Sequence, residues 1–440
     1  MEVSNVRKRS MLSIARGDVI KIFEIIIITL LLILMFQVTS NPLAHITGMW
    51  FLAAVAIVMS GFDFFHPYFW FSLFFTLYCT ANAILWNAGV RAGNYSSEQI
   101  LYSIIALSVV LLVVGPRKLN KEEITSCPSV IRHTTIEKAI EVLAVLTVIF
   151  SVILYLRGYS SKIQMRNEGV IFYRLGVQIV RFLTLFVLLY VGNMLAKKNK
   201  YSWRIIVICG FATLVFTLFT SERDVVFRYG FTIIMLLFAY DIVKPRHLFI
   251  IFPCAMASMI ISVIIKVFFL RGVLNSGTGN IIYDFLSSDF TAAGRNFQYL
   301  LDRPSTSGQL GMKTFFTELF NPILFGVKKI NPDHWFNYEV HTGGYKGYAF
   351  TLVGTGYAIA GLFGIILVFI TVGLIVKYFY SRSIKNNYWM AAYIYLSSTV
   401  IFSFRQSLQT ITGSLVKHIA LGIVFCIIID HTRLSVGKNH

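Results

Sequence analysis

The chain has 440 residues, of which 56% are hydrophobic, 15% aromatic and only 13% charged. The charged share is about half of that in an ordinary soluble domain, and the mean hydropathy is +0.71, so a soluble globular protein is excluded. A net charge of +19 would suggest nucleic acid for a soluble chain, but no basic soluble domain is present to bind it. We therefore expect an integral membrane protein without a nucleic-acid partner.

Long apolar runs indicate how the chain crosses the membrane. In residues 25–36 and 362–376, for example, nearly every side chain is apolar. A backbone in lipid must form helices or a closed barrel, and continuous rather than alternating runs favour helices. We therefore predict an all-α polytopic protein whose residues 1–440 form a single membrane domain. The predicted spans, taken in chain order, are residues 19–38, 43–60, 67–86, 100–115, 139–156, 173–194, 205–220, 229–243, 248–269, 360–379, 388–403 and 412–430.

Basic residues set the expected orientation, because lysine and arginine concentrate in cytoplasmic loops. Both ends of the chain are basic, and so are the connections after the fourth, sixth, eighth and tenth spans. We therefore predict that both termini are cytoplasmic and that one large loop, residues 271–346 between the ninth and tenth spans, faces outward. This topology still leaves almost half of the 39 basic residues on the outer side, while the acidic residues divide about evenly. Such an outer positive field favours an anionic ligand.

The cysteines and the N-terminus add two smaller expectations. None of the five cysteines lies in the long loop, so no disulfide framework is expected. The first apolar run is long enough to span the membrane and has no small-residue cleavage site after it, so we expect no cleavable signal peptide.

The sixth predicted span has polar residues on one helical face. Arg174, Gln178 and Arg181 are spaced i, i+4, i+7, so they lie on the same side of the helix. Arg181 lies inside an apolar run, where a charged side chain usually faces a cavity or a partner. The alternative for both arginines is snorkelling to the outer interface.

Two outer turns add further cations. The turn between spans seven and eight contains Glu222, Arg223, Asp224 and Arg228, and the turn between spans eleven and twelve contains Arg405. Guanidinium groups bind phosphate through paired hydrogen bonds, so Arg223, Arg228 and Arg405 are candidates for binding a lipid-linked phosphate or diphosphate. The alternative is a structural ion pair between Asp224 and Arg228, which are spaced i, i+4.

The long loop is rich in aromatic residues. It contains two predicted amphipathic helices, at about residues 281–301 and 312–324, which we expect to pack on the membrane face with most of their aromatic side chains resting on the membrane. Trp335, Tyr338 and Tyr345 follow among carboxylates and glycines. Aromatic rings stack on sugar faces, so these three residues are candidates for binding a sugar; an ordinary interfacial loop is the alternative.

Chemistry at a sugar hydroxyl requires a general base. Glu339 and His341 are the candidates in the loop, and histidine has the pKa closest to neutrality. Asp224 and Glu222 are competitors from the outer turn. No Asp-x-Asp metal motif occurs in the outer loops, and arginines can neutralise a diphosphate leaving group. We therefore expect neither a metal nor another cofactor.

Residues 351–364, with the sequence TLVGTGYAIAGLFG, run into the tenth predicted span. This stretch and the architecture resemble the Wzy-type O-antigen polymerases of bacterial inner membranes. That family has about twelve spans, cytoplasmic termini, one large periplasmic loop late in the sequence, and a hydroxyl residue followed by a closing G-x-x-G. Thr351, Gly361 and Gly364 fit this pattern. Thr355 stands where many members have an acidic residue, which leaves Glu339 or His341 as the expected base.

The resemblance implies a metal-independent glycosyl transfer on the periplasmic side of the inner membrane. An acceptor sugar hydroxyl on one undecaprenyl-diphosphate-linked repeat unit would attack the anomeric carbon of the chain on another, and undecaprenyl diphosphate would leave. Arg223, Arg228 and Arg405 would clamp the diphosphate, and Arg174 and Arg181 would line the donor or acceptor cavity. The family also implies membrane lipid and a chain-length regulator protein as partners.

Three other functions remain open. An O-antigen ligase performs the same chemistry with a lipid A-core acceptor, and sequence alone separates it poorly from a polymerase. A lipid-linked oligosaccharide flippase also needs cations for the diphosphate, but typically has short loops and a central basic cavity. A proton-coupled sugar transporter would favour two six-span halves joined by a long central cytoplasmic loop, which this sequence lacks.

Overall fold

The computed structural model describes residues 2–89, 95–125, 133–159, 164–165, 168–197, 203–220, 222–251, 253, 291–320, 322–323, 332–340 and 351–436. Within these ranges every regular element is a helix, which confirms the all-α class for this part of the chain. The helices are α1 (Glu2–Val38), α2 (Pro42–Met59), α3 (Pro67–Asn87), α4 (Ser97–Val114), α5 (Lys121–Thr125), α6 (His133–Leu156), α8 (Ile171–Ala196), α9 (Trp203–Thr220), α10 (Arg223–Ala239), α13 (Thr291–Leu301), η2 (Pro304–Thr306), α14 (Gly311–Phe320), α15 (Pro332–Trp335), η3 (Phe336–Val340), α16 (Leu352–Arg382), α17 (Asn387–Ser403), α18 (Gln409–Ser414), η4 (Leu415–Ala420) and α19 (Leu421–Val436).

Nine helical stretches among the described residues are long and apolar enough to cross a membrane, so the chain is a multi-pass membrane protein. These nine coincide with nine of the predicted spans. The predicted spans 229–243 and 388–403 correspond to α10 and α17, which have 17 residues each. The predicted span 248–269 lies almost entirely outside the described residues. The total of twelve spans and their orientation therefore stay predictions.

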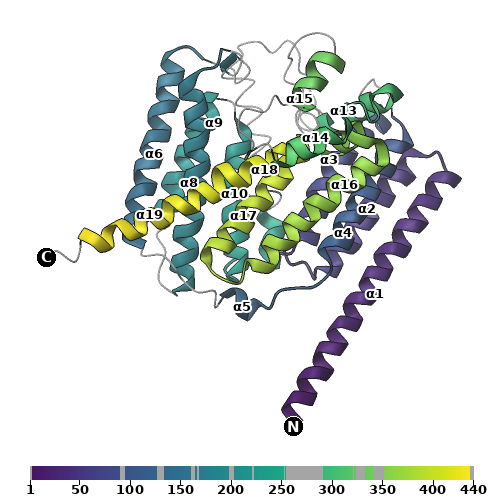
Figure 1. The fold of residues 1–440 in the computed structure, drawn as a ribbon, viewed down its shortest axis with the longest axis horizontal. Helices are drawn as coiled ribbons and strands as arrows, with labels where there is room; N and C mark the ends of the chain where they lie inside the picture. The colour runs from purple at the N-terminus through teal and green to yellow at the C-terminus, as the bar shows by residue number, and fades with distance from the viewer. Residues whose placement is uncertain are drawn as a thin grey trace.

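The helices α3 and α17 form the centre of the bundle. Trp70 and Tyr393 are fully buried. The Trp70 Nε1–H donates to the Tyr393 hydroxyl at 3.2 Å, and that hydroxyl donates to the Phe65 carbonyl at 2.7 Å. Polar groups in an apolar interior need such partners, so this chain of hydrogen bonds fixes α17 against the start of α3. By contrast, α1 runs along one edge of the bundle (Figure 1), and its apolar surface is mostly exposed, as suits contact with lipid.

The two ends of the bundle consist of different elements. The helices α13, α14 and α15, from the long loop, gather at one end, and α5 and the N-terminus lie at the other (Figure 1). At the α5 end, the Leu119 N–H donates to the Tyr380 hydroxyl at 3.2 Å, and Lys377 Nζ donates to the Val113 carbonyl at 2.8 Å. The last turns of α16 are therefore tied to the connection between α4 and α5.

The helix α16 is interrupted near its start. Gly361 has a φ of +60°, in the left-handed region that favours glycine. The break frees the carbonyls of Tyr357 and Ala358, which accept hydrogen bonds from the N–H groups of Gly308 and Leu310 at 3.1 and 2.9 Å. A broken helix is tolerated at membrane depth where other groups satisfy its backbone. The segment between α13 and α14 therefore stabilises the break.

The helix α13 lies inside the bundle and not on the membrane surface. Gly294 is so close to α3 that an added Cβ would lie 3.1 Å from the Cys79 carbonyl oxygen. Phe297 is 2% exposed and packs on rings of α4 and α16 at centroid distances of 6.1 and 5.9 Å. The expectation that the loop aromatics rest on the membrane is therefore wrong for Phe297 and for the buried Phe315 of α14. Residues 281–290 of the predicted first loop helix lie outside the described ranges.

Candidate functional site

A cluster of arginines lies inside the bundle where α8, α10 and α17 meet. Arg228 of α10 is 2% exposed. Its Nη1 donates to Thr399 Oγ1 of α17 at 3.0 Å, and its Nε lies 3.5 Å from Asp224 Oδ2. The ion pair that the i, i+4 spacing allows is therefore formed. A charge buried this deeply requires such partners, so α10 and α17 both hold the guanidinium in place.

The Phe402 ring contacts both Arg228 and a second arginine, Arg405. The helix α17 ends at Ser403, and the following turn places the Arg405 guanidinium 4.6 Å from the centroid of the Phe402 ring. The Arg228 guanidinium lies 4.4 Å from the same centroid. Both distances are within the range of cation–π contacts. One aromatic ring therefore holds two cations close together, and their mutual repulsion is relieved when negative charge lies nearby.

Arg181 of α8 adds a third guanidinium group. Its charge acts on Arg228 and on His418 of η4. The Arg181 Nε atom is buried and has no hydrogen-bond partner in the described part of the chain. Buried N–H groups in proteins are nearly always satisfied. This buried donor is therefore a candidate contact for a ligand.

His418 and Tyr395 complete the cluster, and the sequence analysis missed both. His418 is 3% exposed, and its Nε2 lies 2.6 Å from Gln178 Oε1, so the Nε2–H donates to that amide oxygen. The His418 Nδ1 and the Tyr395 hydroxyl are buried without a hydrogen-bond partner among the described residues. His418 lies in a π-helical turn, and such turns are frequent at functional sites. The available signal was an ionisable residue inside an apolar span.

The cluster has the chemistry of an anion-binding site. Guanidinium groups from α8, α10 and the turn after α17 gather beside an imidazole and a phenol hydroxyl. Guanidinium groups bind phosphate oxygens through charge-assisted hydrogen bonds, and a water-poor interior strengthens these bonds. In the part of the chain that the structure describes, no group of three or more His, Cys, Asp or Glu residues could hold a metal ion.

The remaining polar residues predicted near this site lie at its margin. Arg174 is exposed on α8, and Arg223 is half-buried in the first turn of α10. Glu222 is buried and accepts a hydrogen bond from the Tyr173 hydroxyl, and it lies within hydrogen-bonding reach of Asp224. Burial and the neighbouring Glu222 raise the pKa of Asp224, and Arg228 lowers it by less. Asp224 therefore stays a candidate for the base.

The predicted sugar-binding residues have contrasting environments. Trp335 is 3% exposed, and stacking on a sugar requires an exposed ring face, so the structure does not support Trp335 in that role. Tyr338 is 45% exposed and stacks on the His334 ring at a centroid distance of 4.1 Å. Glu339 is exposed beside it. His341 and Tyr345 lie outside the described residues.

A buried carboxyl group on α14 is the other site candidate that the sequence analysis missed. Glu318 is 1% exposed. Its backbone carbonyl accepts a hydrogen bond from Thr412 Oγ1 of α18 at 2.8 Å, and its carboxyl group faces Ser407 and the start of α18. Burial, with a smaller contribution from Asp333, raises the pKa of Glu318 to about 8. Glu318 therefore titrates near neutral pH, and it faces Ser407, which lies two residues after Arg405 in the chain.

No family model matches the chain, and no curated protein or solved structure matches it significantly.

Proposed function

We propose that the protein is a membrane glycosyltransferase that polymerises undecaprenyl-diphosphate-linked oligosaccharide repeat units on the periplasmic side of a bacterial inner membrane. The observation that supports this most is the arginine cluster, in which Arg181 and Arg228 present guanidinium groups inside a membrane domain. A diphosphate joined to a polyprenyl tail is an anion that reaches this depth, because its tail lies in the bilayer. The resemblance of residues 351–364 to the Wzy-type polymerases favours the same substrate.

In the proposed reaction, an acceptor sugar hydroxyl attacks the anomeric carbon of the donor chain. A carbon–oxygen bond to the acceptor forms while the bond from the anomeric carbon to the diphosphate oxygen breaks, and the bonding electrons leave with undecaprenyl diphosphate. Arg181, Arg228 and Arg405 stabilise the charge that develops on this leaving group.

The proton of the acceptor hydroxyl passes to a general base. Glu339, His341 and Asp224 are the candidates from the sequence. The structure adds Glu318, whose pKa of about 8 suits a proton acceptor near neutral pH. A chain-length regulator protein is a further proposed partner, and it rests on the family resemblance alone.

The test is the surface polysaccharide of a bacterial host deleted for this gene, separated as a gel ladder. We expect a lipid core with a single repeat unit and no ladder, because flipping and ligation survive while polymerisation is lost. A bare core without any repeat would contradict the polymerase and favour a flippase or a ligase.

Complementation then tests the cluster itself. We expect Arg181→Gln and Arg405→Gln to insert normally and to leave the ladder absent. Lys417→Gln is the matched control, because Lys417 is exposed on η4 beside His418, and it should restore the ladder. A normal ladder from both arginine variants would refute the role of the cluster in diphosphate binding.

A further inference from the structure

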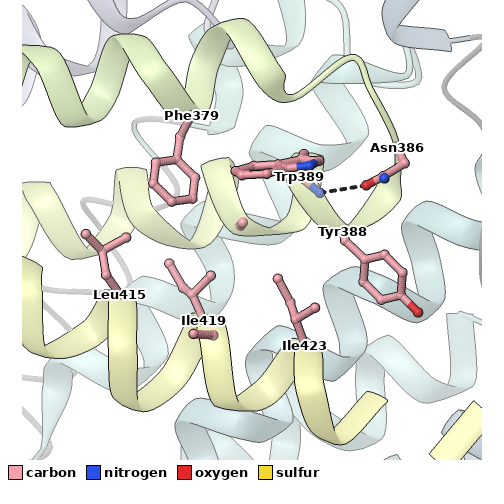
Figure 2. A pocket seen from close by; sticks show the side chains of 9 residues that line it. Phe379, Asn386, Tyr388, Trp389, Leu415, Ile419 and Ile423 are labelled. Atoms are coloured by element: carbon pink, nitrogen blue, oxygen red, sulfur yellow. Dashed lines mark hydrogen bonds between the residues drawn. The ribbon is translucent and has the colours of Figure 1, made fainter. Parts of the chain in front are cut away.

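A second site also borders η4. There α16, α17 and η4 enclose a cavity of about 390 Å³, whose walls include Phe379, Trp389, Leu415, Ile419 and Ile423 (Figure 2). This volume is within the range of small-molecule sites. Its lining is almost entirely apolar, and the exposed Ala420 forms part of its wall. The cavity therefore opens on the lipid-facing surface of the bundle.

The cavity lies near the end of the bundle that holds α5. Its residues Phe379, Asn386 and Trp389 come from the last turn of α16 and the first turn of α17. The same end of α16 is tied to the α4–α5 connection through Tyr380. Because these connections are basic, we predict that this end faces the cytoplasm.

A cation lies at the rim of the cavity. The Arg382 guanidinium lies 4.7 Å from the centroid of the Tyr378 ring and 5.4 Å from that of Trp389, which also lines the cavity. No carboxylate pairs with Arg382 among the residues that the structure describes. The sequence from residue 340 to residue 429 contains no Asp or Glu, whereas Lys385 is exposed three residues after Arg382. The rim is therefore positive.

The rim and the cavity together match one kind of molecule. An apolar cavity can hold an acyl chain. Tryptophan and tyrosine at the membrane interface contact the glycerol region of a lipid. Basic residues between helices on the cytoplasmic side bind anionic head groups. We propose that this cavity binds an anionic phospholipid of the cytoplasmic leaflet, with its phosphate at Arg382 and one acyl chain between Phe379 and Ile423. This site is separate from the proposed diphosphate site and does not depend on the proposed polymerase activity.

The test is native mass spectrometry of the full chain in detergent, titrated with phosphatidylglycerol, with phosphatidylcholine and with a polyprenyl phosphate. We expect phosphatidylglycerol to be retained at least about fivefold more tightly than phosphatidylcholine, since one basic residue near an anionic lipid contributes about 1 kcal/mol. Arg382→Gln should abolish this preference. Ala420→Phe, which fills the cavity without changing charge, should reduce retention of phosphatidylglycerol.

A matched control separates the site from general surface charge. Lys313 is exposed on α14, which lies at the opposite end of the bundle, so Lys313→Gln should keep the preference. Equal retention of the two phospholipids by the unmodified chain would overturn the proposal, because it would identify ordinary annular lipid. Preferential retention of polyprenyl phosphate that is lost in Ala420→Phe would also overturn it, because the occupant would then be a substrate tail.

Discussion

The buried pair of Arg228 and Asp224 offers the sharpest test of the arginine cluster. Their side chains are 3% and 4% exposed, and their charged atoms are 3.5 Å apart. At an effective dielectric constant of about 20, two unit charges at this distance attract by about 5 kcal/mol. Removing one member of a buried pair typically costs about 3–5 kcal/mol, because the other charge stays buried without its partner. Arg228→Gln and Asp224→Asn should therefore each destabilise the protein strongly.

The double variant distinguishes a structural pair from a ligand-binding arginine. Arg228→Gln combined with Asp224→Asn removes both charges at once, so we expect most of the stability to return. Thermal unfolding in detergent measures this recovery of stability, with the fluorescence of the six tryptophans as the signal. If Arg228 binds the diphosphate, the recovered double variant should still make no polymer in the ladder assay. A stable double variant that restores the ladder would refute the assignment and leave Arg228 a purely structural role.

The other predictions concern the long loop, residues 271–346, and the break in α16. The pKa of Glu318 is raised to about 8 from an ordinary 4.5, so its contribution to stability is full below about pH 4.5 and is lost as the pH rises to about 8. Melting temperatures should fall between pH 5.5 and 8.5 less steeply in Glu318→Gln than in the unmodified protein, and equal slopes would contradict the assignment. Gly364→Ala should destabilise the protein by about 1–3 kcal/mol, because its Cβ would collide with a carbonyl across the break, whereas Gly413→Ala, which has open space, should melt normally. Of Glu339→Gln and His341→Ala, one should reduce the polymer ladder far more than the other; two normal ladders would mean that the base lies elsewhere.

Much of the fold follows from simple patterns in the sequence. Nine helical stretches coincide with predicted spans because twenty-residue apolar runs leave few alternatives in lipid. The contact between Asp224 and Arg228 also follows, since residues four apart on a helix are neighbours. The insertion of α13 could not be predicted in this way. An amphipathic pattern shows that one face of a helix is apolar, but it does not show whether lipid or protein covers that face.

The missed site residues have a common physical cause. His418 and Glu318 each gain their environment from a distant part of the chain. The partner of His418 is Gln178, and the carboxyl group of Glu318 faces the start of α18. Spacing along one helix predicts neighbours on that helix only. Contacts between segments more than 80 residues apart require the packing itself.

The helix α18 connects α14 of the long loop with the arginine cluster. Arg405 lies in the turn before α18, and His418 lies in the π-helical turn after it. The Glu318 carbonyl accepts a hydrogen bond from Thr412 in α18 itself, so α14 is fixed to the helix that joins the two polar groups. The segment between α13 and α14 is in turn bonded to the break in α16 through Gly308. Because hydrogen bonds hold the loop at both points, α14 has a fixed position beside α18. Glu318 therefore keeps a constant position relative to the turn that bears Arg405, as a proton acceptor at this site would require.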